Sequence, residues 1–468
     1  MERVRFSWGF VAVGVLLVSR APAQLPLDFE GTTYPTGACP ATIAAADLDE
    51  DGTLDLLVAN HHTHEFSVYV GDGSGSLESR PGVPVSGQHD SHALSLALGD
   101  FDEDGHVDAA TSSFANNEVI VFLGKGDGSF GEYLPIPVGR FSVRVASGDL
   151  DGDGHLDLAS CNRDDGEISL LAGDGDGAFA APRTLAAGKA PTAIEAADMD
   201  GDMRLDLVTA DSVGKTVTIL LGDGAGAFPE TTTIEGFENT GYALPVDLDG
   251  NGTLDLAVAH GDRVSLLAGK GSAGSGDFEP MDDLVTGSNS LMVGAGDWND
   301  DGRLDIVTAN WRRGDVSIYL AEGTWGFAAP KDLPAGEAPW GVLAADLNAD
   351  GRDDLIVTNE LENTMIVFLN RTFERAPFRR ADANADTQLD ISDGVFILDF
   401  LFLGRAVPRC RGALDANADS EVNITDGVYV LQHLFSGGPA PPEPFRECGV
   451  DETAPFNCRE PTGGCASF

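Results

Sequence analysis

An aspartate-rich nonapeptide returns seven times along this chain of 468 residues. Each copy has aspartate at positions 1 and 9 and aspartate or asparagine at positions 3 and 5, and successive copies start 49 to 53 residues apart. Internal repeats of this length indicate a solenoid, an open array or a propeller. The copies start at Asp47, Asp100, Asp149, Asp198, Asp247, Asp297 and Asp346.

The segments between the nonapeptides repeat as well. Small residues lead into each copy, and an apolar run, a second β-branched run and a glycine-rich turn follow it. Since no helical periodicity interrupts these runs, each repeat predicts four short strands. Four strands of about six residues, with connections of similar length, fill a period of about 48 residues. Four-stranded sheets repeated around an axis are the blades of a β-propeller, so we expect an all-β, seven-bladed ring.

The two ends of the repeat region complete one another. The seventh repeat stops after its third strand, at residues 365–370, whereas residues 27–37 have the pattern of a fourth strand that precedes the first repeat. An N-terminal strand that completes blade seven leaves no open sheet edge at the seam. We therefore predict a closed ring over residues 24–373 rather than an open array.

The nonapeptides resemble the FG-GAP, or VCBS-type, repeats of integrin α-like propellers, whose motif is D-x-D-x-D-G-x-x-D. The resemblance extends over about residues 27–373, and seven copies in phase make it specific. It implies calcium in each loop, a secreted or cell-surface setting, and a binding role more often than an enzymatic one.

Coordination chemistry leads to the same expectation. Calcium takes six to eight oxygen ligands, and alternating aspartates in a tight turn point every second carboxylate inward. Positions 1, 3, 5 and 9 would supply side chains, and position 7 a backbone carbonyl. The predicted metal ligands are Asp47, Asp49, Asp51, Thr53, Asp55, Asp100, Asp102, Asp104, His106, Asp108, Asp149, Asp151, Asp153, His155, Asp157, Asp198, Asp200, Asp202, Arg204, Asp206, Asp247, Asp249, Asn251, Thr253, Asp255, Asp297, Asn299, Asp301, Arg303, Asp305, Asp346, Asn348, Asp350, Arg352 and Asp354.

The seven loops are not equivalent. Loop four has Met203 where the sharp turn favours glycine, so whether it holds calcium stays open. Loops five to seven carry Asn251, Asn299 and Asn348 in place of one carboxylate, which predicts weaker binding. We expect calcium to stabilise the ring by neutralising the repulsion among the carboxylates. Plain acidic turns are the alternative.

A different loop pattern follows Arg380. Two 12-residue loops, 382–393 and 415–426, each precede an amphipathic segment, and this pairing resembles a type I dockerin. The resemblance implies a small α-helical domain at residues 381–437 that folds around calcium, and a cohesin-like partner. Position 6 is Thr387 and Ser420 rather than glycine, which departs from the usual loop. The implied ligands are Asp382, Asn384, Asp386, Gln388, Asp390, Asp393, Asp415, Asn417, Asp419, Glu421, Asn423 and Asp426.

Residues 374–380 are expected to be a linker, and residues 438–468 a tail rich in proline and cysteine. Four of the six cysteines, Cys410, Cys448, Cys458 and Cys465, crowd near the C-terminus. In an oxidising compartment such a cluster suggests two disulfides. The short Cys448–Cys458 loop is the first candidate, and all three connectivities stay open.

The N-terminus predicts the compartment. Residues 1–23 combine Arg3 and Arg5, a short apolar run and an A-x-A site ending at Ala23, which are the features of a secretory signal peptide. We expect a secreted or cell-surface protein, with the periplasm and an uncleaved anchor as alternatives. The formal net charge of −48 excludes nucleic acid as an ordinary partner. No later stretch approaches the roughly 18 apolar residues of a membrane span.

The face opposite the aspartate loops is the candidate ligand face. In an up-and-down blade the connections from strand 1 to strand 2 and from strand 3 to strand 4 lie on one face. The connections from strand 2 to strand 3 and from strand 4 to the next blade lie on the opposite face. There the sequence gathers histidine, arginine and aromatic residues that suit a glycan or an extracellular protein. The candidates are His61, His62, His64, His89, His92, Arg140, Tyr242, Trp311, Arg312, Arg313 and Trp340. Ordinary loop residues are one alternative, and a transition-metal site of the five histidines is another.

The sequence contains no H-E-x-x-H, no G-x-S-x-G and no Walker loop, and we interpret its GDG turns as hairpin glycines. No catalytic residue is therefore assigned. The leading hypothesis is a secreted, calcium-binding, non-catalytic adhesion or scaffold protein whose dockerin-like module docks to a partner. The alternative is a secreted carbohydrate-active enzyme, a lyase or a glycosidase, with its site on the ligand face.

Overall fold

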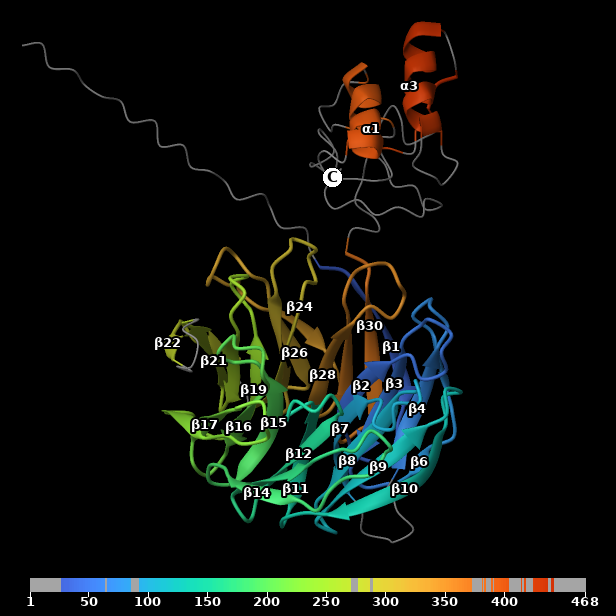
Figure 1. Cartoon of the computed structure of the whole chain (residues 1–468). Coiled ribbons are helices and arrows are strands. Elements are labelled where there is room, and N and C mark those ends of the chain that lie inside the picture. The colour runs from blue at the N-terminus through green and yellow to red at the C-terminus, as the bar shows by residue number, and fades with distance from the viewer. Residues whose placement is uncertain are drawn as a thin grey trace, which may run out of the picture. The chain divides into compact units, whose positions relative to one another are not determined.

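The computed structural model describes residues 27–63, 65–85, 92–270, 277–286 and 289–372, and toward the C-terminus 381, 383, 389, 391–403, 414, 416–417, 424–436 and 439–441. The chain divides into two units, of which the larger spans Leu27–Arg375 and the smaller includes Ala376–Phe468. The larger unit consists of seven antiparallel sheets, the blades, set around a common axis (Figure 1).

The blades share one strand order, which runs outward from an inner strand. The inner strands are β2 (Pro40–Ala46), β7 (Ala93–Gly99), β11 (Ser142–Gly148), β15 (Pro191–Ala197), β19 (Thr240–Val246), β24 (Ser290–Gly296) and β28 (Pro339–Ala345). The second strands are β3 (Asp55–Asn60), β8 (Asp108–Ser113), β12 (Asp157–Asn162), β16 (Asp206–Asp211), β20 (Asp255–His260), β25 (Asp305–Asn310) and β29 (Asp354–Asn359).

The outer half of each blade is more irregular. The third strands are β4 (Glu65–Gly71), β9 (Glu118–Gly124), β13 (Glu167–Leu171), β17 (Thr216–Leu221), β21 (Arg263–Gly269), β26 (Asp315–Tyr319) and β30 (Thr364–Asn370). The outer strands are β5 (Leu77–Ser79) with β6 (Val83–Pro84), β10 (Phe130–Pro137), β14 (Arg183–Ala186), β18 (Glu230–Glu235), β22 (Phe278–Pro280) with β23 (Leu284–Val285), β27 (Lys331–Pro334) and β1 (Phe29–Pro35). In blades one and five the outer strand is thus split into two short pieces that pair with the same neighbour.

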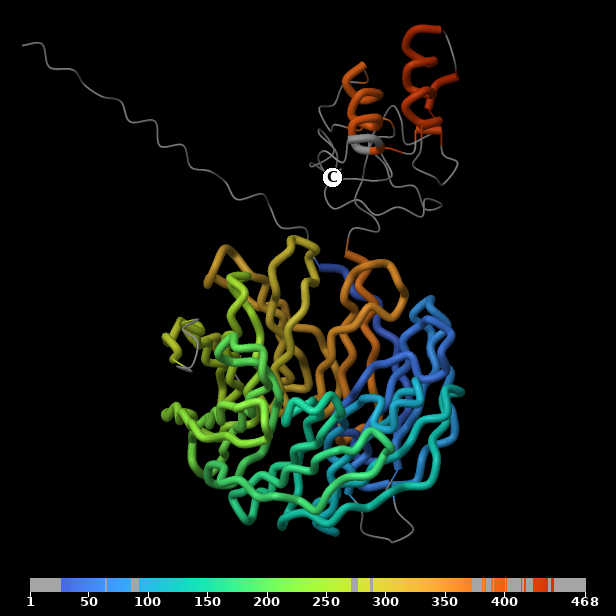
Figure 2. The backbone as a smooth tube through the Cα atoms, in the orientation of Figure 1, coloured from blue at the N-terminus to red at the C-terminus, as the bar shows by residue number. Residues whose placement is uncertain are grey.

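The N-terminal strand closes the ring. β1 pairs antiparallel with β30 along its whole length, from Phe29 opposite Asn370 to Pro35 opposite Thr364. The inner strands also contact one another around the ring, and β28 of blade seven lies against β2 of blade one. Figure 2 follows the chain from the blue first strand to the orange strand beside it. The predicted seven-bladed propeller, with its N-terminal strand in blade seven, is confirmed.

Packing explains the sequence of each strand. Every residue of the seven second strands is buried, since each blade is covered on both faces by its neighbours. The inner strands converge on the axis, where small residues such as those of the PATIAAA segment of β2 avoid collision. The residue at position 2 of each nonapeptide is also buried, and Trp298 is fully enclosed. Burying such a side chain contributes about 1.5–3 kcal/mol, so the loops are anchored by their own apolar residues.

The smaller unit contains two described helices, α1 (Ile391–Leu403) and α3 (Ile424–Ser436), which pack against one another. Their shared core includes Ile397, Leu414 and Val430. No helix in the described part of the chain is long and apolar enough to cross a membrane. The dockerin-like module stays a prediction, as do the signal peptide, the linker and the disulfides. Outside the described residues lie residues 1–23, 374–380 and 442–468, Cys410, and the implied ligands Asp382, Asn384, Asp386, Gln388, Asp390, Asp415, Asp419, Glu421 and Asn423.

Candidate functional site

The seven nonapeptides connect each inner strand to the second strand of its blade, so they all lie on one face of the ring. We call this the aspartate face, comprising residues 47–55, 100–108, 149–157, 198–206, 247–255, 297–305 and 346–354. The loops therefore lie where the repeat pattern predicts them.

Each loop is held by its own carboxylates. In loop one, Asp47 accepts hydrogen bonds from the backbone N–H groups of Asp51 at 3.1 Å and Gly52 at 3.0 Å. Asp51 in turn accepts one from the N–H of Thr53 at 2.9 Å. The turn places Gly52 at φ 89°, in the left-handed region that glycine adopts without strain. In the other six loops the position 1 aspartate likewise accepts the N–H of position 6. It also accepts the N–H of position 5 in every loop except loop three, where the N–H of Asp153 donates to Asp151 and the N–H of Gly152 takes its place on Asp149.

Position 9 has a structural role that the sequence pattern does not reveal. Asp55 is fully buried and accepts two backbone hydrogen bonds, from Leu48 at 2.8 Å and from Gly71, at the end of the third strand, at 2.9 Å. The equivalent aspartate makes both bonds in every blade. This carboxylate thus ties its loop to the middle of its blade.

The carboxylates at positions 1, 3 and 9 converge in the first four loops. One oxygen from each of these residues, for example Asp47, Asp49 and Asp55, lies within 4.8 Å of the others. The Oδ1 atom of Asp49 is buried and has no hydrogen-bond partner in the described part of the chain. Several carboxylate oxygens with one left unsatisfied are a donor set that suits a hard cation such as calcium. The residues of these loops therefore fit the ion that the repeat implies.

Burial and like charge both act on the position 9 carboxylates. Burial raises the pKa of Asp108 and Asp206 to about 6, and nearby aspartates of the same loop add to the shift. For Asp305 burial is deeper, and the pKa rises to about 7. The two backbone hydrogen bonds oppose these shifts without cancelling them. A bound cation would favour the charged form of the same groups.

Three loops contain a cation of their own. The guanidinium groups of Arg204, Arg303 and Arg352, at position 7, pair with the position 5 aspartates of loops four, six and seven. The side chain of Arg352 is only 3% exposed, whereas that of Arg204 is 48% exposed. Because an internal guanidinium occupies one of the carboxylates that would face calcium, these loops differ chemically from loops one, two, three and five.

Loop four keeps its shape despite its methionine. Met203 stands at position 6 with φ 67°, and the residue is 92% exposed. Asp198, Asp200 and Asp206 still converge as their counterparts do. The turn therefore tolerates a side chain there by pointing it into solvent, at the cost of a left-handed backbone.

Several residues of the predicted ligand face are already engaged. Arg140 forms an ion pair with Asp165 at 2.7 Å. The indole N–H of Trp311 donates to Glu360 at 2.7 Å, and Arg313 pairs with Asp315 and Asp332. Arg312 is exposed, and Trp340 is partly buried against the core of blades four to six.

The structure brings three of the five predicted histidines together. His61 and His62 follow β3, His92 precedes β7, and one nitrogen from each ring lies within 4.8 Å of the others. Burial lowers the pKa of His61 to about 4, and the two neighbouring rings add to this, so His61 is neutral near pH 7. His64 and His89 lie outside the described residues.

Tyr242 lies in inner strand β19 and lines the central channel instead of a surface loop. The channel encloses about 380 Å³ and is bordered by all seven inner strands. There the Tyr242 hydroxyl donates to Glu195 at 2.5 Å, and the Arg144 guanidinium lies 4.8 Å from the ring centre of Tyr242. Burial raises the pKa of Glu195. Sequence reasoning missed Arg144 and Glu195, although they are the only charged residues of the inner strands.

Comparison with solved structures gives propellers at low identity. BBS1N, in a crystal structure of its complex with ARL6DN, is 12% identical with a TM-score of 0.53, and the match covers 73% of this chain and 96% of that one. The periplasmic gluconolactonase PpgL of Pseudomonas aeruginosa is 14% identical with a TM-score of 0.50, covering 64% of this chain and 86% of that one. An Agrocybe aegerita lectin specific for non-reducing terminal N-acetylglucosamine is 19% identical with a TM-score of 0.48, covering 63% and 80%. The likenesses to BBS1N and PpgL concern the fold alone.

A comparison with curated protein sequences gave no match. The sequence model of the FG-GAP-like repeat matches six overlapping stretches, 47–111, 109–160, 149–209, 198–258, 247–308 and 297–357. Together they cover well over half of the chain and are in phase with the blades. The chain therefore belongs to the FG-GAP-like repeat family, and its repeats build a seven-bladed propeller.

Proposed function

We propose that this protein is a secreted, calcium-stabilised binding protein, an adhesion or scaffold component, whose propeller recognises a glycan or an extracellular protein. The observation that carries the calcium part is the convergence of three carboxylates in each of the first four loops, with a buried oxygen of Asp49 left without a partner. Such a group costs free energy unless a cation satisfies it.

Calcium would be held by the side chains of positions 1, 3, 5 and 9 in loops that lack an arginine, and it would supply positive charge that offsets the repulsion among their carboxylates. In loops four, six and seven the arginine at position 7 already supplies part of that charge. We therefore propose calcium chiefly in loops one, two, three and five, with the weakest binding in loop seven, where Arg352 is buried.

The binding part of the proposal rests on the face opposite the aspartate loops. Arg312 is exposed there, and the half-buried Trp311 and Trp340 belong to repeats six and seven. These are groups that contact sugars or carboxylates. BBS1N, which shares this fold, was solved in complex with a protein, ARL6DN. The dockerin-like module would then attach the ring to a cohesin-like partner.

Chelation tests the calcium part. We expect excess EGTA to lower the melting temperature by several degrees, because the repulsion among the loop carboxylates is no longer offset. Asp49→Asn should remove most of the calcium-dependent gain of loop one, whereas Asp72→Asn, in an exposed turn of the same blade, should leave it unchanged. Identical melting curves with and without EGTA would contradict calcium as a stabiliser.

Retention on a polysaccharide and protein array, with and without calcium, tests the binding part. We expect retention without turnover, and loss of retention in a Trp311→Ala, Arg312→Ala variant that melts like the parent chain. Release of reducing or unsaturated sugar ends would instead favour the alternative of a carbohydrate-active enzyme. Sequencing the N-terminus of the mature protein tests secretion, with cleavage after about Ala23 expected.

A further inference from the structure

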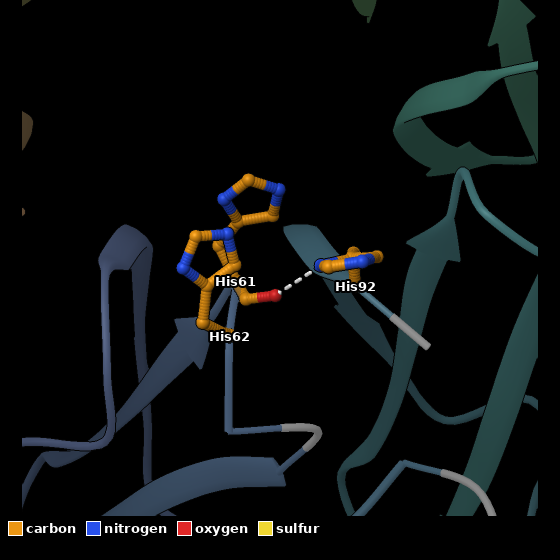
Figure 3. Close-up of side chains that lie close together, drawn as sticks. All are labelled: His61, His62 and His92. Atoms are coloured by element: carbon orange, nitrogen blue, oxygen red, sulfur yellow. Dashed lines mark hydrogen bonds between the residues drawn. The ribbon is translucent and has the colours of Figure 1, made fainter. Parts of the chain in front are cut away.

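Three histidines and a cysteine meet on the ligand face between blades one and two. The rings of His61 and His62 are stacked with centroids 4.3 Å apart, and the ring of His92 lies 4.8 Å from that of His61 (Figure 3). The Sγ atom of Cys39 lies 3.1 Å from Nδ1 of His62. Neither cysteine of the described residues, Cys39 or Cys161, forms a disulfide.

Backbone hydrogen bonds fix these groups in place. His61 N–H donates to the carbonyl of Cys39 at 2.9 Å, and His62 N–H donates to that of Ala38 at 3.0 Å. Nδ1–H of His92 donates to the carbonyl of His61 at 2.6 Å, so the lone pair of His92 is on Nε2. A ring N–H bonded to a backbone carbonyl is the usual second contact of a metal-binding histidine.

One nitrogen of the cluster is left unsatisfied. Nε2 of His61 is buried and has no hydrogen-bond partner in the part of the chain that the structure describes. A buried polar atom without a partner costs free energy, and a bond to a metal would remove that cost. Packing alone gives no reason for a nitrogen at this point.

The same backbone frame in other blades carries different side chains. In blade three the backbone N–H of Arg163 donates to the carbonyl of Phe141, and in blade seven the backbone N–H of Glu360 donates to that of Ala338. These are the counterparts of His61 and Cys39. The fold therefore requires the backbone pair but neither the cysteine nor the histidines.

We propose that His61, His62 and His92 bind one zinc ion, with the thiolate of Cys39 as the fourth ligand. Three imidazoles and one thiolate form a tetrahedral donor set that favours zinc, whereas calcium prefers oxygen ligands. Tetrahedral zinc places its nitrogen ligands about 3.3 Å apart. The ring nitrogens lie within 4.8 Å of one another, so small side-chain rotations would bring them to that distance. The site is separate from the aspartate face and would tie blade one to blade two.

The test uses the full chain without a polyhistidine tag, dialysed against zinc sulfate in saturating calcium, so that the aspartate loops do not take up zinc. We expect one zinc per chain by elemental analysis. The variant His61→Gln, His62→Gln and the variant His92→Gln should each weaken zinc binding by at least about 10- to 100-fold. His433→Gln, in the C-terminal unit, is the matched histidine control and should bind zinc like the parent chain.

Cobalt chloride reports the ligands directly. Tetrahedral cobalt should give intense visible bands, together with a thiolate-to-cobalt band that Cys39→Ser removes. Melting curves in calcium show whether each variant is folded. If the double variant does not fold, His92→Gln tests the same site by removing the ligand that blade two contributes. The site would be overturned if the parent chain takes up no zinc, or if the parent chain and His92→Gln take up equal amounts. An unchanged cobalt spectrum in Cys39→Ser would overturn the fourth ligand. If the site is overturned, the histidines serve as aromatic packing with Phe114, whose ring stacks on that of His92 with the centroids 4.6 Å apart.

Discussion

Loop one and loop seven follow the same backbone course but differ in what stands beside their carboxylates. In both, the position 1 aspartate accepts the N–H groups of positions 5 and 6, and the position 9 aspartate accepts those of position 2 and of the third strand. Loop one leaves a buried oxygen of Asp49 without a partner, whereas loop seven pairs Asp350 with the buried guanidinium of Arg352.

The difference separates two requirements that the nonapeptide combines. The hydrogen bond from position 6 to position 1 and the two bonds to position 9 are common to all seven blades, so the fold itself needs the aspartates at positions 1 and 9. The loops differ in how their negative charge is neutralised, because either a bound ion or an internal arginine can supply the positive charge. Loops that contain an internal arginine are expected to lose less stability when calcium is chelated.

The largest effect should come from the shared hydrogen bonds. Asp55→Ala and Asp354→Ala each leave two buried N–H groups without an acceptor, which should lower the free energy of unfolding by about 4 kcal/mol. The loss should appear in EGTA as well as in calcium, because the two bonds need no ion. Urea unfolding in both buffers measures it, and a loss that vanishes in EGTA would show that position 9 acts only through calcium.

A smaller effect should follow from removing the internal cation of loop seven. Arg352→Thr, which installs the residue found at position 7 of loops one and five, leaves the half-buried carboxylate of Asp350 without its charged partner and should cost about 2 kcal/mol in EGTA. Calcium should restore part of this stability, since the loop then resembles loop one. The exposed pair of loop four offers the control, as Arg204→Thr should cost under about 1 kcal/mol. Equal losses with and without calcium would count against the exchange of arginine for calcium.

The smallest effect concerns the turn of loop four. Met203→Gly relieves a left-handed backbone strain and should raise the free energy of unfolding by about 1 kcal/mol. Gly52→Ala, at the same position of loop one, should lower it by a similar amount. Thermal melting of both variants in calcium checks the pair, and a destabilised Met203→Gly would show that the methionine has a stabilising contact.

Sequence reasoning reached the fold because its signals are local. The nonapeptide fixes the connection between two adjacent strands, and the runs on either side fix the strands, so seven in-phase copies predict seven blades. The closing strand was also readable, since residues 27–37 supply what the seventh repeat lacks, and β1 confirms it. The split of the outer strand in blades one and five was not predicted, because the pieces are short and mostly exposed and so carry a weak hydrophobic pattern.

The candidate site was predicted in part. The aspartates of positions 1 and 3 were expected to converge and do so in the first four loops, but the double backbone role of Asp55 and its counterparts has no sequence signature. That the arginines at position 7 offer backbone carbonyls to calcium stays a prediction, whereas the pairing of their side chains with the position 5 aspartates was not predicted. Tyr242, which the sequence predicts to lie in a loop, belongs to inner strand β19, because that strand begins two residues earlier than its apolar run suggests.

The sequence by itself determined the number of blades, the closure of the ring and the face on which the aspartates lie, because each depends on residues within one repeat or on strand order. Only the tertiary structure decided which side chains of different blades meet. The contacts of Arg144 with Tyr242 and Met292, and the approach of His92 to His61, join residues that are 31 to 148 positions apart. Such contacts depend on how neighbouring blades pack against one another, and no spacing within a single repeat encodes that.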